Sequence, residues 1–270
     1  MKEEPVPHNN TARLIPARAL GNVGAFALTL ASAAIFVVCF FSSAVRAGED
    51  LAIPSNVAWT TETIAEASSG DNFRGMLLAR RCEHCHGAEG FSPVAFTPNL
   101  ASMNKLTVWK QLEDFSAGKR RSLVMVPIAQ SLSLRDIADL AAYYSTLPVF
   151  PDPQDNRVFP QSPTGSSHQE MASRLITFGD GERGIPPCQS CHGPIAFKIG
   201  APSLSTQNAD YLLNQLEAFA KRQRTNDVNE PMRTIASLLS EEERHALAEY
   251  YGAGLGLQPS SASGAPFHNN

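Results

Sequence analysis

The chain has 270 residues, which is long enough for two domains of about 100 residues each and an additional segment at one end. Its formal net charge of −4 at pH 7 provides no basic field for nucleic acid, so no nucleic-acid partner is expected. The hydrophobic content of 43% is ordinary for a chain that buries a core.

The N-terminal region predicts export. Residues 24–45 carry no charged side chain, three basic residues precede them, and Val45-Arg46-Ala47 is a small-x-small step typical of signal-peptidase cleavage. We therefore interpret residues 1–47 as a signal peptide for the bacterial periplasm. The apolar run is also long enough to cross a membrane, so an uncleaved hydrophobic helix that anchors the protein to the inner membrane through residues 24–45 is the alternative.

The rest of the chain is an internal repeat. The stretch CEHCHG at residues 82–87 returns as CQSCHG at 188–193, QLEDF at 111–115 returns as QLEAF at 215–219, and LAAYY at 140–144 returns as LAEYY at 247–251. Such agreement in order and spacing indicates a duplicated module. We predict an N-terminal linker at 48–68, domains at 69–150 and 167–253, a proline-rich linker at 151–166 between them, and a flexible tail at 254–270.

Each half has helical periodicity. Apolar residues recur at helical spacing up to the end of QLEDF and QLEAF, at Leu106, Trp109, Leu112 and Phe115 and again at Leu212, Leu216 and Phe219. Ser133 and the Ser240–Glu243 pair are helix caps, and shorter helices are expected near 71–81 and 167–178. No alternating strand pattern of useful length occurs, so the fold class is all-α.

The Cys-x-x-Cys-His motif is the attachment signature of c-type haem, in which the two thiols bind the vinyl groups and the histidine ligates iron. The predicted attachment residues are Cys82, Cys85, Cys188 and Cys191. His86 and His192 follow the second cysteine of each motif, so they are the predicted iron ligands. His84 lies inside the first motif and is expected to face outward without metal.

Two other readings of the cysteines are weaker. A structural zinc site needs paired CxxC knuckles roughly 15 to 20 residues apart, whereas Cys85 and Cys188 are separated by 103 positions. Thioredoxin-type redox chemistry requires a βαβ setting, and plain disulfides would leave both histidines without a role.

The second axial ligand decides between an electron carrier and a catalyst, because a six-coordinate iron transfers electrons and an open iron binds oxygen species. Met125 lies 43 positions after Cys82, and Met232 lies 44 positions after Cys188. Both are followed by x-x-Ile-Ala and a capped helix, which favours a loop over the distal face of the haem. These equivalent positions make Met125 and Met232 the predicted ligands, against the plainer reading of core methionines.

Residues 70 to 252 resemble the di-haem cytochromes c4, which are tandem class I cytochrome c domains of the bacterial periplasm. The resemblance rests on CEHCHG and CQSCHG, on KRRSLVMVPIAQSL and NDVNEPMRTIASLL, and on the DLAAYY and ALAEYY helices. It implies two covalent haems with histidine and methionine ligands. It also implies that Pro98-Asn99-Leu100 and Pro202-Ser203-Leu204 lie beside the proximal histidines.

We therefore expect an electron-transfer protein without substrate chemistry. The resemblance suggests a quinol-oxidising cytochrome complex as donor and a terminal oxidase or another cytochrome as acceptor. One alternative is the di-haem cytochrome subunit of a periplasmic dehydrogenase, such as the partner of a flavoprotein. A di-haem peroxidase is a third hypothesis, which methionine at both equivalent positions opposes. Arg120 and Arg222 are candidates for neutralising haem propionates or orienting an anionic partner.

Overall fold

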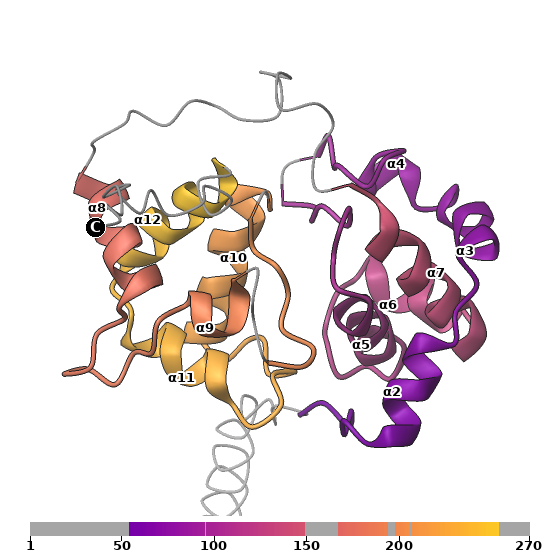
Figure 1. The fold of residues 1–270 in the computed structure, drawn as a ribbon, viewed down its shortest axis with the longest axis horizontal. Coiled ribbons are helices and arrows are strands. Elements are labelled where there is room, and N and C mark those ends of the chain that lie inside the picture. The colour runs from indigo at the N-terminus through magenta and orange to yellow at the C-terminus, as the bar shows by residue number, and fades with distance from the viewer. Residues whose placement is uncertain (1–53, 95, 149–166, 194–197, 206, 254–270) are drawn as a thin grey trace, which may run out of the picture. The chain divides into compact units, whose positions relative to one another are not determined.

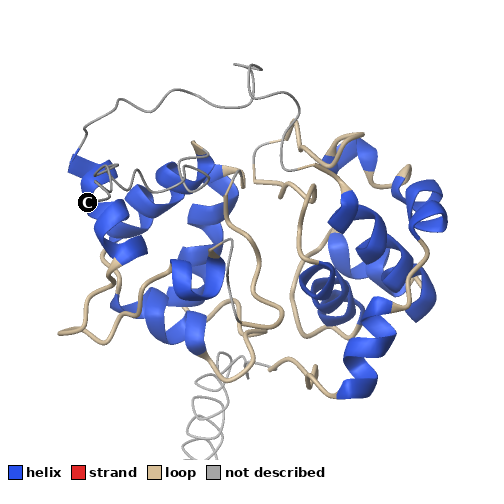
Figure 2. Ribbon diagram, in the orientation of Figure 1, coloured by secondary structure: helices blue, strands red, loops and turns tan. Residues whose placement is uncertain are grey.

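The computed structural model describes residues 54–94, 96–148, 167–193, 198–205 and 207–253. The predicted leader at 1–47, with its apolar run, lies outside these residues, as do the proline-rich linker and the tail. Figure 2 shows helices and loops throughout the described residues and no strand among them, apart from one isolated bridge between Asp180 and Ile185. No helix of the described part is both long and apolar enough to cross a membrane.

The helices follow the two repeats (Figure 1). The first repeat contains α2 (Thr61–Ser68), α3 (Asn72–Ala79), α4 (Glu83–His86), α5 (Lys105–Ser116), α6 (Met125–Gln130) and α7 (Leu134–Thr146). The second contains α8 (Ser167–Thr177), α9 (Gln189–His192), α10 (Ala209–Ala220), α11 (Pro231–Leu238) and α12 (Glu241–Gly252). The prediction of an all-α fold is confirmed for the described residues.

Each repeat has its own hydrophobic core. In the first, α3 and α5 pack on α7, and the buried side chains include Trp109, Leu140 and Tyr144. In the second, α8 and α10 pack on α12 around Leu175 and Tyr251. The apolar faces that the helical periodicity predicted are therefore the faces that meet in the cores.

The capping signals in the sequence operate as predicted. The hydroxyl of Ser133 accepts a hydrogen bond from Asp136 N, and the Asp136 carboxylate accepts one from Ser133 N. Ser240 and Glu243 form the same reciprocal pair at the start of α12. These boxes satisfy backbone donors that a helix start otherwise leaves without partners.

The predicted linker at 48–68 is helical in its second half. Helix α2 begins after Thr60, whose hydroxyl accepts a hydrogen bond from Thr63 N, and it packs on α5 and α7. Before it, the Trp59 ring lies 6.5 Å from the Trp109 ring. The apolar pattern of this short segment is too brief to distinguish a helix from a linker in the sequence. A helix of this length is stabilised mainly by its contacts with the rest of the protein, here with α5 and α7.

Helix α3 crosses α7 at a glycine. A Cβ added at Gly75 would lie 2.0 Å from the backbone oxygen of Asp139 and 2.8 Å from Cβ of Tyr143. Real Cβ atoms do not approach backbone oxygens this closely, so the two helices can touch only because residue 75 has no side chain.

Gly75→Ala is therefore expected to lower the free energy of unfolding by about 2–3 kcal/mol, since the overpacking outweighs the gain of about 1 kcal/mol in helix propensity. Denaturant unfolding followed by circular dichroism measures this change. Gly181→Ala is the matched control, because a Cβ there meets no atom within 4 Å, and it should change stability by less than about 0.5 kcal/mol. A Gly75→Ala protein as stable as its parent would contradict the tight crossing.

Candidate haem sites

The first Cys-x-x-Cys-His motif forms a single helical turn, α4. Cys82 precedes the turn, and its carbonyl accepts hydrogen bonds from Cys85 N (3.2 Å) and His86 N (2.9 Å). Both cysteines are free thiols; Cys82 is partly buried and Cys85 is exposed. Burial raises the pKa of the Cys82 thiol.

The second motif forms an equivalent turn, α9. Here the Cys188 carbonyl accepts from Cys191 N at 3.2 Å and from His192 N at 2.9 Å, as in the first repeat. Both thiols are free and partly buried, and burial raises the pKa of Cys188 to about 11. Each repeat therefore presents two unpaired thiols and a histidine on one turn of helix.

The two histidines share one hydrogen-bond arrangement. Nδ1 of His86 lies 2.9 Å from the carbonyl oxygen of Pro98, and Nδ1 of His192 lies 2.9 Å from that of Pro202. Because a carbonyl only accepts, Nδ1 of each ring donates, and Nε2 is left unprotonated in the neutral ring. Burial lowers the pKa of both histidines, which favours this neutral form. A neutral imidazole fixed through Nδ1 is the usual state of a metal-ligating histidine.

His84 lacks the burial of a metal-ligating histidine. Its side chain is exposed on the surface of α4, while His86 is only 8% exposed. No group of three or more His, Cys, Asp or Glu side chains that could hold a metal ion occurs among the described residues. The part of the chain that is described thus contains no protein-only zinc site of the kind considered from the sequence.

The methionines begin short helices and do not lie in open loops. Met125 is the first residue of α6, which packs on α5, and Met232 is the second residue of α11, which packs on α10. Both side chains are partly buried. The histidine and methionine of each repeat therefore come from different elements, α4 and α6 in the first and α9 and α11 in the second.

Unsatisfied and exposed groups fit a bound porphyrin. The buried Trp109 Nε1 and Tyr251 hydroxyl have no hydrogen-bond partner among the described residues. Beside Met125, the side chains of Leu123 and Val124 are 99% and 60% exposed. Buried donors normally have partners and large apolar side chains normally have cover, so both observations agree with a large apolar group that also carries acceptors.

Four side chains form a polar cluster where the repeats meet, which we call the Arg–Gln cluster: Arg120, Arg224, Gln111 and Gln215. Arg120 donates to Gln111 Oε1 at 2.7 Å and to Gln215 Oε1 at 2.9 Å. Arg224 donates to the same two oxygens, at 3.0 and 2.8 Å respectively. The guanidinium groups stack on Phe115 and Phe219, 4.6 and 4.4 Å from the ring centroids.

Arg222, the other arginine proposed from the sequence as a candidate for neutralising a propionate or orienting an anionic partner, does not belong to the Arg–Gln cluster. Arg222 is exposed and forms an ion pair with Glu230 at 3.4 Å. Arg222 lies seven positions after Gln215, whereas Arg120 lies nine positions after Gln111, so the two arginines are not at equivalent positions in the repeat. Counting forward from the glutamines, nine positions in each repeat, would have selected Arg224.

A buried ion pair lies beside this cluster and was not anticipated from the sequence. Lys110 and Asp114 form an ion pair on α5, and both side chains are almost fully buried. Asn226 of the second repeat completes the group, because its carbonyl accepts from Lys110 Nζ at 2.6 Å and its amide donates to Asp114 at 2.7 Å. Burial lowers the pKa of Lys110, and the Asp114 carboxylate opposes that shift.

Comparison with known proteins agrees with this arrangement. No protein-family profile matches the chain. A cytochrome c4 of Thiocapsa roseopersicina is 37% identical over 63% of this chain and 84% of its own length. A thiosulfate dehydrogenase electron acceptor of Stutzerimonas stutzeri (strain A1501) is 38% identical over 64% of this chain and 78% of its own length. The crystal structure of reduced cytochrome c4 from Pseudomonas stutzeri matches with a TM-score of 0.61 and 31% identity, covering 68% of this chain and 98% of that one.

The repeat, the helical fold, the paired Cys-x-x-Cys-His turns and these relatives lead to one conclusion. The chain belongs to the cytochrome c4 family, and it is a di-haem c-type cytochrome that transfers electrons and is not an enzyme.

Proposed function

We propose that this protein carries electrons between respiratory partners in the periplasm. Cys82 and Cys85 attach one haem and Cys188 and Cys191 attach the other, in domains that span residues 69–150 and 167–253. The proposed iron ligands are His86 with Met125 and His192 with Met232. The observation that carries the proposal is the pair of Cys-x-x-Cys-His turns in which Nδ1 of each histidine donates to a backbone carbonyl, which leaves Nε2 of the neutral ring unprotonated.

When bound, each haem would supply one-electron exchange at its iron. The chain contributes thiols for attachment, one histidine and one methionine for each haem, and an apolar setting for the iron. A thioether and an imidazole as the two protein ligands would raise the reduction potential and would leave no position free for oxygen species. These features support a carrier over a peroxidase, as does the arrangement of both methionines in equivalent places after the motif.

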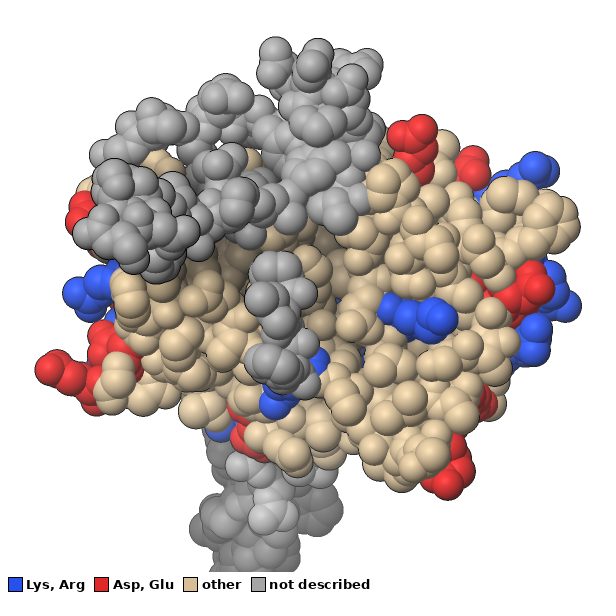
Figure 3. All heavy atoms as spheres, viewed as in Figure 1, with Lys and Arg blue, Asp and Glu red and all other residues tan. Residues whose placement is uncertain are grey.

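The donor and acceptor remain proposals. We propose a quinol-oxidising cytochrome complex as donor and a terminal oxidase or another cytochrome as acceptor. On the face shown in Figure 3, acidic and basic side chains are scattered over a mostly uncharged surface, so charge on this face does not mark a docking surface. Partner choice therefore has to be measured.

A second candidate is an electron acceptor for a periplasmic dehydrogenase. The specific observation in its favour is the 38% identity with a protein named as a thiosulfate dehydrogenase electron acceptor. Both candidates need the same haems and ligands, and they differ in which protein supplies the electron.

Stopped-flow reduction of the oxidised holoprotein separates these possibilities. A quinol-oxidising complex with its quinol and a thiosulfate dehydrogenase with thiosulfate are offered as donors in parallel. We expect fast reduction of both haems by the first and slower reduction by the second, and the reverse order would favour the dehydrogenase role. Sustained consumption of hydrogen peroxide by the reduced protein would contradict both and restore the peroxidase hypothesis.

A further inference from the structure

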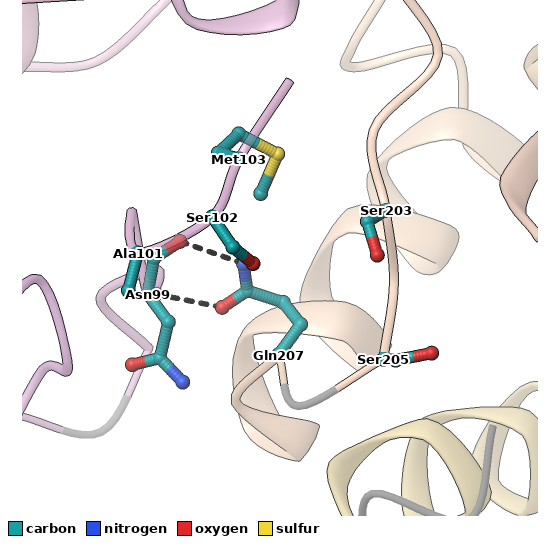
Figure 4. Close-up of a pocket in the computed structure, with 7 residues that line it drawn as sticks. All are labelled: Asn99, Ala101, Ser102, Met103, Ser203, Ser205 and Gln207. Atoms are coloured by element: carbon teal, nitrogen blue, oxygen red, sulfur yellow. Dashed lines mark hydrogen bonds between the residues drawn. The ribbon is translucent and has the colours of Figure 1, made fainter. Parts of the chain in front are cut away.

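Gln207, a residue of the second repeat, contacts the loop that holds the histidine of the first. Its side chain is only 4% exposed. Oε1 accepts a hydrogen bond from Asn99 N at 2.7 Å, and Nε2 donates to Asn99 O at 2.9 Å. Figure 4 shows both bonds beside a small polar pocket to which each repeat contributes residues. The amide of Gln207 thus binds both backbone groups of one residue in the other repeat.

These bonds continue a chain of hydrogen bonds that begins at a proposed iron ligand. His86 donates from Nδ1 to the carbonyl oxygen of Pro98. That carbonyl and Asn99 N belong to the same peptide group, and Asn99 N donates to Gln207. A peptide that donates through its N–H becomes a stronger acceptor at its oxygen, because consecutive hydrogen bonds polarise one another. Gln207 therefore strengthens the acceptor on which His86 depends.

The position of Gln207 is well fixed. Its backbone N–H donates to Leu204 O at 3.1 Å, and its Oε1 also accepts from Asn208 N at 2.9 Å. On the other side, the Asn99 side chain accepts from Ser92 N at 2.8 Å. With both partners held by their own loops, the contact has a defined geometry and does not depend on a mobile side chain.

The carbonyl that accepts from His192 in the second repeat has no equivalent of Gln207, because the first repeat has a different residue at the corresponding position. Gln207 lies five positions after Pro202, and the residue five positions after Pro98 is Met103. A methionine thioether has no N–H to donate and is only a weak acceptor. Met103 also packs against the hydrophobic core of its own repeat. His192 thus donates to the Pro202 carbonyl, and among the described residues no amide side chain of the first repeat binds the peptide that follows Pro202.

We propose that Gln207 is a positioning residue that lowers the reduction potential of the haem in the first repeat, and so makes the two haems inequivalent. This rests on the proposed ligation by His86. A stronger acceptor for the Nδ1 proton makes the imidazole a better electron donor, which favours ferric over ferrous iron. The second repeat thereby adjusts the haem of the first through a backbone peptide.

The test is a redox titration of the holoprotein, followed by NMR so that the two haems are observed separately. Gln207→Met supplies the residue that the first repeat has at this position. We expect its first haem to shift roughly three- to tenfold toward the ferrous state at fixed potential, up to about 59 mV, with the second haem unchanged. The exchangeable Nδ1 proton of His86 should also exchange faster with solvent.

Two further variants distinguish electronic from merely structural effects. Gln207→Glu keeps an oxygen that accepts from Asn99 N, so the first potential should stay at or below that of the parent. Ser205→Ala changes a residue of the same pocket that is not part of the hydrogen-bond chain, and it should leave both potentials in place. A shift in the same direction for Gln207→Met and Gln207→Glu would overturn the proposal.

The outcomes also separate this inference from the proposed function. If the parent protein lacks two haems with histidine and methionine ligands, the proposed function fails. If the parent has them and Gln207→Met leaves both potentials unchanged, only the role of Gln207 is refuted.

Discussion

Met125→Ala is expected to open one of the two irons, and Met232→Ala the other. Loss of the thioether should lower the reduction potential of that haem by on the order of 0.1 V or more, because methionine opposite histidine raises it. The weak long-wavelength absorption band of sulfur-ligated ferric haem should fall by about half in each variant. Carbon monoxide should then bind the reduced protein at one site per chain, and at two in the double variant.

Met76→Ala is the matched control, because Met76 lies on α3 and is partly exposed. It should retain both potentials, the full absorption band and no binding of carbon monoxide. If the band were insensitive to Met125→Ala and Met232→Ala, other side chains would be the distal ligands. An open iron in the parent protein would then make catalysis a serious alternative to electron transfer.

Replacing both cysteines of one motif by alanine is expected to remove one covalent haem. A chain with Cys188→Ala and Cys191→Ala should carry one haem where the parent carries two, since the thiols are the only covalent link between polypeptide and porphyrin. The same holds for Cys82→Ala with Cys85→Ala. Mass spectrometry of the denatured protein, which retains only covalent haem, measures the number directly.

His84→Ala is the control for that experiment. The residue lies between the two cysteines of the first motif but is exposed and makes no contribution to the proposed site. This variant should keep two haems and both potentials. Two covalent haems in either double cysteine variant would mean that the attachment residues are wrongly assigned.

Local sequence patterns were sufficient to predict the helical fold. The spacing of apolar residues located α5 and α10, and Ser133 and Ser240 marked the starts of α7 and α12. Each of these signals acts within a few residues of chain, where helix geometry fixes what can touch.

Contacts between distant segments could not be predicted in this way. Arg224 was not singled out because its partner in the first repeat, Gln111, lies 113 positions away in the sequence. Gln207 was missed because its partner, Asn99, lies 108 positions away in the sequence. Nothing in the composition around either residue indicates that it meets the other repeat, and the two glutamines of the Arg–Gln cluster were noted only as part of the repeated text.

The buried ion pair of Lys110 and Asp114 makes the two repeats unequal at their contact. The second repeat has the uncharged residues Asn214 and Ala218 at the corresponding positions. The first repeat therefore supplies the ion pair of this contact, and the second repeat supplies Asn226, which bonds to it. A chain of two first halves would bury two such ion pairs and would have no Asn226 to complete the hydrogen bonds of either, and buried charges that lack hydrogen-bond partners are costly. The two repeats have therefore diverged at this contact: each provides groups that the other lacks, and neither can substitute for the other.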